Sequence, residues 1–232
     1  DKLDVSLRFD TRVERLDADL VIGADGARSF VREKSGIGTR DFPYGQTAFV
    51  THLKTEKPHG KTAYQRFMTD GPLGMLPLAD GRISIVWSMH DALAGRVQDA
   101  SETELGEILS EASDYALGTL QPAGPRAAFP LCARHATQYV MPGVALIGDA
   151  AHAIHPLAGQ GANLGLQDAA RLAEVLDSAL GNGEHPGDLP VLRRYERARK
   201  GENAAMLHFM TGLNTLFTTD SALVRELRVV GM

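Results

Sequence analysis

Residues 146–166 read LIGDAAHAIHPLAGQGANLGL. An apolar stretch ends in the pair Gly148-Asp149, and a glycine-rich turn then leads into a helical pattern that begins near Asn163. A glycine lets the backbone come close to a ligand, and a carboxylate at a strand end can accept hydrogen bonds from sugar-like hydroxyl groups. Free N–H groups at a helix start can face an anionic or electron-rich group. The segment therefore predicts a strand, a turn and a helix that hold a ligand.

The same spacing also fits a strand, turn and helix whose glycines merely permit tight packing, and the segment alone favours neither interpretation. A second polar loop favours the binding interpretation. Residues 19–29 read DLVIGADGARS. A short buried strand is therefore followed by one tight loop that contains Asp25, Gly26 and Arg28, and Arg32 lies one helical turn later. This set suits a polar, phosphate-bearing ligand, although taken alone Asp25 is better explained as a cap on the next helix.

The residue pattern in the middle of the chain predicts an antiparallel sheet. Ile83, Ile85, Trp87 and Met89 alternate with more polar residues, which predicts a strand with one buried face. Glycine, proline and Asp-Gly pairs separate this strand from its neighbours. The predicted strands of the whole chain cover residues 4–9, 19–24, 48–54, 62–68, 82–89, 127–132 and 144–147.

Three further helices are expected. Ser101 followed three residues later by Glu104 forms a capping-box pattern, which predicts a helix start at that point. A second helix should cover 163–180, with its apolar stripe formed by Leu172, Ala173, Leu176 and Leu180. A third should cover 189–217; its apolar residues fit packing on the domain, or alternatively a surface for a partner or a membrane interface.

Composition and charge exclude several classes of protein. The 232 residues carry a net charge of −5, which makes nucleic acid an unfavourable partner. Cys132 is the single cysteine, so no internal disulfide can form and a reducing compartment is expected. No stretch of about 18 apolar residues and no signal peptide is found, and we expect both chain ends to be cut.

Together, the two polar loops resemble a known pair of motifs. Asp25-Gly26 resembles the DG motif of the class A FAD-dependent aromatic monooxygenases, the relatives of p-hydroxybenzoate hydroxylase, and Gly148-Asp149 resembles their GD motif. The resemblance covers nearly the whole chain. Within the family, residues 72–78, 84–88 and 155–166 are most similar to the ubiquinone-biosynthesis hydroxylases.

The resemblance implies an α/β fold that is the remnant of an FAD-binding domain with an inserted antiparallel sheet. Residues 1–36 and 133–181 would form the FAD-binding part, residues 37–132 the substrate sheet, and residues 182–232 a C-terminal helical region.

The resemblance also implies which residues contact the cofactor. Asp149 would bind the ribityl or phosphate-proximal part of FAD, Pro156 would lie along the flavin ring, and the backbone near Gly161 would face its pyrimidine edge. The implied cofactor-binding residues are Gly148, Asp149, Pro156, Gly159, Gly161, Ala162 and Asn163, with Asp25, Gly26 and Arg28 near the pyrophosphate. No catalytic side chain is implied, because the flavin itself carries the chemistry. We therefore expect His152 and His155 to be structural, and no third ligand beside them suggests a metal.

One departure from the family is large. The family begins with a βαβ unit that carries G-x-G-x-x-G, whereas the only comparable run here, beginning at Gly159, is G-x-G-x-x-x-G in another place. We therefore expect this chain to lack the AMP-binding half of the site and to bind FAD weakly by itself. A non-catalytic module that kept the fold and lost flavin binding remains an alternative, as does a related epoxidase or reductase. A tryptophan-dependent halogenase is disfavoured because its motif needs two tryptophans.

The activity implied is hydroxylation of an aromatic ring, with O₂ as the oxygen source and NAD(P)H as the transient reductant. The substrate implied is a polyprenylated ubiquinone precursor. Because such a substrate resides in lipid, we expect a cytoplasmic protein that associates with the inner face of the membrane or with a biosynthetic complex. A homo-oligomer is also compatible with the sequence.

Overall fold

A computed structural model describes residues 3–8, 13–156 and 159–218. Phe9 of the first predicted strand, Leu157 and Ala158 of the glycine-rich turn, and residues 219–232 lie outside the described residues. The chain divides into two compact units. Unit 1 comprises residues 1–42 and 132–211, and unit 2 comprises residues 43–131 and 212–232.

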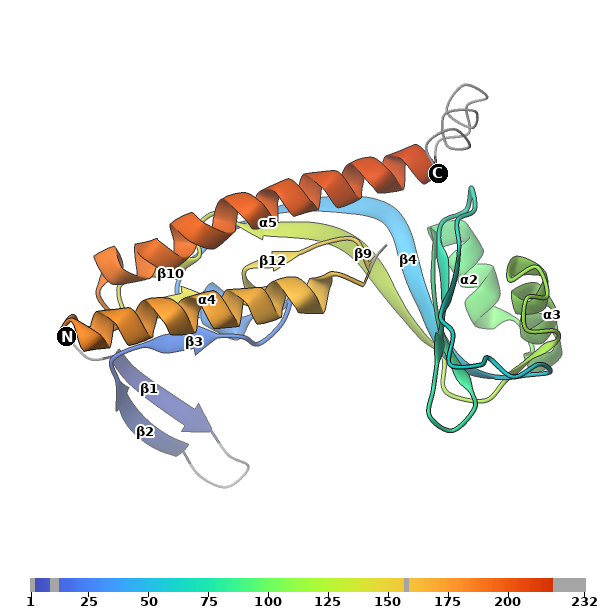
Figure 1. The fold of residues 1–232 in the computed structure, drawn as a ribbon, viewed down its shortest axis with the longest axis horizontal. Helices are drawn as coiled ribbons and strands as arrows, with labels where there is room; N and C mark the ends of the chain where they lie inside the picture. Colours follow the sequence, from blue (N-terminus) through green and yellow to red (C-terminus); the bar gives the residue numbers. More distant parts are fainter. Residues whose placement is uncertain (1–2, 9–12, 157–158, 219–232) are drawn as a thin grey trace. The chain divides into compact units, whose positions relative to one another are not determined.

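Unit 1 is built on a small sheet in which β11 is central. β10 (Val140–Met141) pairs antiparallel with β11 (Val144–Leu146), and β11 pairs parallel with β3 (Val21–Gly23). β1 (Leu3–Arg8) and β2 (Val13–Ala18) form a separate antiparallel pair, and α1 (Phe30–Lys34) follows β3 (Figure 1). Two long helices complete the unit, α4 (Gly161–Gly181) and the part of α5 (Leu189–Thr218) that ends at residue 211.

The core of unit 1 is formed by β11 and by one face each of α4 and α5. Tyr139 and Tyr195 are fully buried there beside Leu146, Leu172 and Leu192. The predicted helix at 163–180 is confirmed, but its predicted stripe is wrong in part. Ala173 and Leu180 are exposed, and the buried face of α4 carries Leu164, Asp168, Leu172, Val175 and Ala179.

Unit 2 is an antiparallel sheet backed by two helices. Most of this sheet belongs to unit 2. Its strand order is β12-β9-β4-β7-β6-β5, with β8 (Leu120–Pro122) also paired to β4. Its strands are β4 (Thr39–Thr55), β5 (Tyr64–Arg66), β6 (Leu73–Pro77), β7 (Ile83–His90) and β9 (Ala127–Ala136); the short β12 (His152–Ala153) belongs to unit 1. Both β4 and β9 cross a unit boundary, at 42/43 and 131/132.

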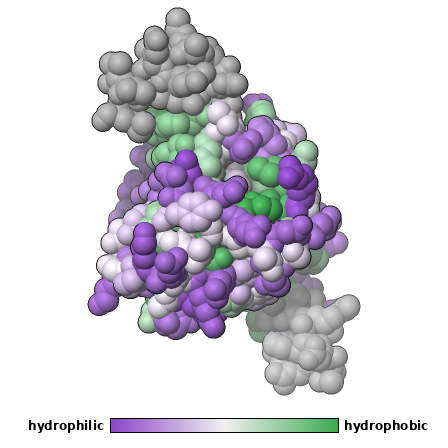
Figure 2. Space-filling model, turned by 90° about the vertical axis from the view of Figure 1, so that its right-hand side faces the viewer, coloured by the Kyte–Doolittle hydropathy of each residue, from purple (hydrophilic) through white to green (hydrophobic). Residues whose placement is uncertain are grey.

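The alternation predicted for β7 is confirmed. Ile83, Ile85, Trp87 and Met89 are all buried, and they form one core with residues of α2 (Asp91–Asp99) and α3 (Glu102–Ala112). The predicted capping box of α3 is also present, since the Ser101 hydroxyl accepts from the Glu104 amide and the Glu104 carboxylate accepts from the Ser101 amide. The face that carries these helices is mostly hydrophilic, with only small hydrophobic patches (Figure 2).

The opposite face of the sheet carries a different set of side chains. Val50 of β4, Val86 of β7 and Gly74 of β6 lie side by side across three strands, because Val50 pairs with Val86 and Val86 with Gly74. These three residues are half-buried, and the neighbouring Leu76 is 48% exposed. The helices α2 and α3 pack on the other face. On this face, Gln46, Ala48 and Ser88 are buried, and Asn214 of α5 donates to Gln46 over 3.1 Å, so the exposed part is the region of Val50, Val86 and Leu76.

Candidate functional site

The two polar loops begin at the same edge of the small sheet in unit 1. β3 and β11 are parallel neighbours, Gly23 pairs with Leu146, and the Ile147 amide donates to the Gly23 carbonyl over 3.0 Å. Ligands bind preferentially outside the carboxyl ends of parallel strands. The Asp25-Gly26 loop and the Gly148-Asp149 turn both follow those carboxyl ends, so the structure brings the two predicted motifs together.

The Asp25 loop is held by hydrogen bonds at the start of α1. Ser29 is the cap of this helix and accepts from the Arg32 amide, while the Asp25 carboxylate accepts from the Val31 amide over 3.1 Å. Partial burial alone would raise the pKa of Asp25, but hydrogen bonds from Ser29 and the Val31 amide outweigh it, so the pKa lies below its usual value. Asp25 is therefore an exposed, ionised carboxylate that also serves the helix start.

Two arginines, Arg32 and Arg134, hold these loops in position. Arg32, which is buried, donates to the Ala27 carbonyl and to the Ala150 carbonyl, each over 2.8 Å. Arg134 on β9 also donates to the Ala27 carbonyl and forms a two-bond pair with Asp41, at 2.9 and 2.6 Å. The sequence suggested Arg32 only as support for the phosphate region and contained no local signal for Arg134 or Asp41.

The Gly148-Asp149 turn is one short 3₁₀ turn, η1 (Gly148–Ala150). Gly148 has a φ of +57°, which a residue with a side chain adopts only with strain. A Cβ on Gly165 of α4 would lie 3.2 Å from the Gly148 Cα, so the two glycines also let the helix and the turn pack closely. Asp149 is exposed next to this contact and is available to an external hydrogen-bond donor.

The start of α4 leaves room and donors for a ligand. Its cap residue Gln160 makes no side-chain capping hydrogen bond, and no acidic residue lies in the first turn. A Cβ on Gly159 or Gly161 would meet nothing within 4 Å, and both Ala162 and Asn163 are exposed. The N-terminal end of a helix with this open space fits a flat group that is electron-rich or negatively charged. Pro156 precedes this turn and is half-buried.

The structure also describes the surroundings of Gly26, Arg28 and the two histidines near the turn. Gly26 has a φ of +80° with open space around it, and Arg28 is exposed. His152 and His155 are both 1% exposed, and His152 Nε2 donates to the Asp168 carboxylate over 2.5 Å. Burial lowers the pKa of His155 to about 4, so this side chain is neutral at physiological pH. Both histidines are thus buried inside unit 1, in agreement with a structural role.

A buried carboxylate is the main element of the site that sequence reasoning missed. Asp168 is completely buried on α4 and contacts the turn, His152 and α5. The available signal was its spacing, because Asp168 falls four residues after Leu164 and four before Leu172 on the same helical face. A charged residue in an apolar stripe is buried only with partners.

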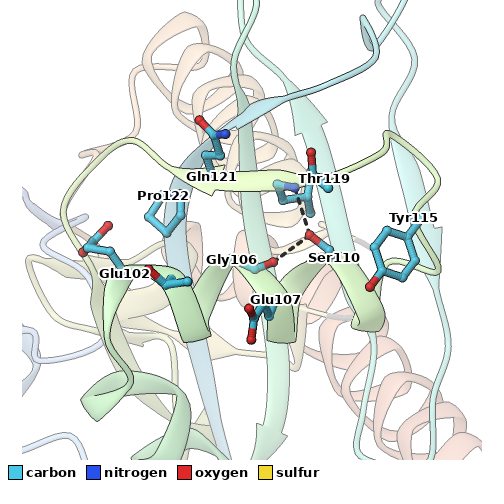
Figure 3. A pocket seen from close by; sticks show the side chains of 10 residues that line it. Glu102, Gly106, Glu107, Ser110, Tyr115, Thr119, Gln121 and Pro122 are labelled. Carbon is cyan, nitrogen blue, oxygen red and sulfur yellow. Dashed lines mark hydrogen bonds between the residues drawn. The ribbon is translucent and has the colours of Figure 1, made fainter.

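Other cavities lie away from these loops, one of them beside Trp87 and Leu93 in unit 2. In unit 2, a pocket of about 420 Å³ lies between α3 and β8 (Figure 3). Its central hydroxyl, Ser110, already donates to the Gly106 carbonyl and accepts from the Leu120 amide, so it offers little to a ligand. In unit 1, a groove of about 640 Å³ runs between α5 and the segment 135–137. There Lys200 donates to the Thr137 carbonyl and lies 3.7 Å from Glu196.

Within the described ranges, no three histidine, cysteine, aspartate or glutamate side chains gather closely enough to hold a metal ion. No helix among those same residues combines the length and the apolar character needed to cross a membrane.

Comparison with known proteins identifies one family, and the similar proteins include hydroxylases of ubiquinone or its precursors. Residues 3–210 match a family model described as an FAD binding domain. The 3-demethoxyubiquinol 3-hydroxylase of Escherichia coli strain K12 is 40% identical over 219 residues, which cover 94% of this chain and 56% of that protein. The ubiquinone hydroxylase UbiL of Rhodospirillum rubrum is 42% identical over 216 residues, covering 93% and 50%. The chain spans about half the length of these relatives.

A solved structure supports the same fold. The anhydrotetracycline hydroxylase OxyS from Streptomyces rimosus matches with a TM-score of 0.73 and 25% identity, over 99% of this chain and 46% of that one.

Proposed function

Because the chain belongs to the FAD binding domain family, we propose that it forms the flavin-ring and substrate portion of an FAD-dependent, NAD(P)H-using hydroxylase that acts on an aromatic ring. The observation that carries this proposal is the meeting of the Asp25-Gly26 loop and the Gly148-Asp149 turn at the carboxyl ends of two parallel strands. The relatives named as ubiquinone hydroxylases support an aromatic substrate on the ubiquinone pathway.

The residues of the chain fit FAD by their chemistry. The exposed Asp149 carboxylate suits the hydroxyl groups of the ribityl chain, and each such bond to a charged acceptor contributes about 1.5–3 kcal/mol. The uncapped N-terminal end of α4, with open space at Gly159 and Gly161, suits negative charge on the pyrimidine edge of the ring. Pro156 borders this space, and Gly26 and Arg28 suit the phosphates. Electron uptake from NAD(P)H and reaction with O₂ are supplied by the flavin when it is bound.

The substrate surface we propose is the part of the sheet in unit 2 that lies opposite α2 and α3. Its apolar positions Val50, Gly74 and Val86 are half-buried and Leu76 is exposed, and Gly74 adds no side chain to the surface. Such a surface suits an aromatic ring and the first part of a prenyl tail, by hydrophobic burial rather than by polar recognition. A substrate with a long prenyl tail would bring the protein to a membrane surface, so peripheral membrane association is part of this proposal.

The test is FAD retention by the full-length gene product. Replacing Asp149 with Asn keeps the shape of the side chain but removes the charge, and we expect the dissociation constant for FAD to rise about tenfold. Asp177→Asn is the matched control, since Asp177 is an exposed aspartate on α4 outside the site. Unchanged FAD affinity in Asp149→Asn would remove Asp149 from the site.

The full-length gene product also separates the hydroxylase from a module that kept the fold without binding flavin. If the full-length gene product is purified without flavin and takes up none from solution, the non-catalytic module is the correct function. If it binds one FAD and consumes NAD(P)H with a quinone precursor, the hydroxylase is correct.

A further inference from the structure

Asp168 lies where a charge is costly. It is completely buried on the face of α4 that otherwise carries Leu164, Leu172 and Val175. A buried carboxylate needs hydrogen bonds or an opposite charge to remain ionised. Asp168 has both: burial would raise its pKa, but hydrogen bonds from His152, Arg199 and Asn203 outweigh that effect and lower it. Asp168 is therefore ionised at neutral pH.

The two oxygens of this carboxylate serve different parts of unit 1. Oδ2 accepts from the Gly148 amide over 3.0 Å and is 2.5 Å from His152 Nε2. Oδ1 accepts from Arg199 Nε over 2.8 Å and from Asn203 Nδ2 over 3.0 Å. One oxygen thus holds the turn that carries Asp149, and the other holds α5.

The contact to Gly148 controls the direction of Asp149. The turn η1 has no side-chain cap of its own, and Gly148 has the left-handed φ of +57°. A glycine is free to leave that conformation, because no Cβ restricts its backbone. The bond from its amide to a buried charge opposes this freedom, so it determines where the next residue, Asp149, presents its carboxylate.

If Asp168 served only to join α4 to α5, its Oδ1 contacts to Arg199 and Asn203 would be explained, but its Oδ2 contacts would not. Arg199 has partners besides Asp168, since it donates to Glu202 over 2.5 Å and to Asn203 over 3.0 Å. Tyr195 of α5 also donates to the Leu146 carbonyl over 2.8 Å, so α5 is joined to the end of β11 independently. Among the residues that the structure describes, Oδ2 contacts only the turn and the histidine that follows it.

We infer that Asp168 is a positioning residue for the flavin site: through Gly148 and His152 it holds the Gly148-Asp149 turn in the geometry that presents Asp149 to the ribityl chain. This inference rests on the proposed function for the ligand, but its geometric part concerns this chain alone.

The experiment measures FAD affinity and visible absorbance in the full-length gene product. Asp168→Asn has one acceptor oxygen, so it cannot accept from both the turn and α5. We expect the dissociation constant for FAD to rise about tenfold or more, with a shifted band of the bound flavin. Asn203→Ala is the control, since it removes a bond to the other oxygen of the same carboxylate; it should lower the melting temperature but leave the FAD dissociation constant within about twofold.

A second pair of variants covers the case in which Asp168→Asn does not fold. His152→Gln keeps an N–H donor that can reach the carboxylate, and His152→Leu removes it. The inference expects near-wild-type FAD affinity in the first variant and a loss of about tenfold in the second. Equal affinity in His152→Leu and the wild type, or equal loss in Asn203→Ala and Asp168→Asn, would overturn it.

Failure of the proposed function can be told apart from failure of this inference. If the wild type binds no FAD, the proposed function is wrong, and amide hydrogen exchange still tests the positioning. In Asp168→Asn, exchange at Gly148 should accelerate about tenfold more than exchange at the core residue Val175, because only Gly148 loses its bond to the carboxylate. Equal acceleration at the two sites would contradict the inference.

Discussion

The guanidinium of Arg32 donates a hydrogen bond to the carbonyl oxygen of Ala150 over 2.8 Å, although 118 positions separate the two residues in the chain. A second bond from the same guanidinium reaches the Ala27 carbonyl. One buried side chain therefore joins the loop after β3 to the turn after β11, which are the two segments that form the candidate flavin site.

Replacing Arg32 with Met should destabilise unit 1, because the Ala150 carbonyl loses its Arg32 donor, while the Ala27 carbonyl keeps the bond from Arg134. The free energy of unfolding should fall by about 1–3 kcal/mol, measured by urea unfolding. Arg28→Met, in the loop just before α1, is the matched control; Arg28 is exposed, so its loss should change stability by less than about 0.5 kcal/mol. Similar losses in the two variants would mean that Arg32 does not join the segments.

The features predictable from the sequence are those with local signals. The Asp25-Gly26 loop, the Gly148-Asp149 turn and the alternating strand at 83–89 each depend on residues within about ten positions of one another, and the structure contains all three. The capping box at Ser101 is equally local.

The features that could not be predicted depend on distant partners. Arg134 and Asp41 are 93 positions apart, and no pattern near either residue indicates the other. The buried face of α4 was misjudged because alanine and leucine occur on more than one side of this helix, so Leu180 fitted an apolar stripe equally well. Asp168 could have corrected that stripe only if its buried partners on α5 had been known.

The stability of the protein should fall on mild acidification because of His155. Its pKa is about 4 in the folded protein and about 6.5 when unfolded. Between these values the unfolded state binds more protons, so the free energy of unfolding decreases as the pH falls from 6.5 toward 4. From pH 7 to pH 5 this residue should contribute a loss of about 2 kcal/mol.

His155→Phe removes the titrating group and keeps an aromatic ring at the buried position. Urea unfolding of both proteins at pH 7 and pH 5 measures the difference. The wild type should lose about 2 kcal/mol more than the variant over this interval, and an equal loss in both would show that His155 titrates normally.

The helix α3 in unit 2 should depend on its capping box. The Ser101 hydroxyl accepts from the Glu104 amide, and the Glu104 carboxylate accepts from the Ser101 amide over 2.9 Å. Ser101→Ala should cost about 1 kcal/mol, with faster amide exchange in the first turn of α3. Thr103→Ala, an exposed change in the same turn, should be neutral or slightly stabilising. Because unit 2 is a separate compact unit, FAD affinity should be unchanged in both.

Gly165 should respond to substitution unlike an ordinary helical glycine. A Cβ there would lie 3.2 Å from the Gly148 Cα, whereas a Cβ on Gly201 of α5 would meet nothing within 4 Å. Alanine in place of a helical glycine normally stabilises by about 0.5–1 kcal/mol, and Gly201→Ala should show this gain in thermal unfolding. In Gly165→Ala the contact should cancel the gain, because the added methyl group pushes the turn away from α4. That displacement moves Asp149, so FAD affinity should fall about tenfold, as measured by flavin fluorescence. If Gly165→Ala instead stabilises as much as Gly201→Ala and binds FAD normally, the glycine pair has no part in shaping the site.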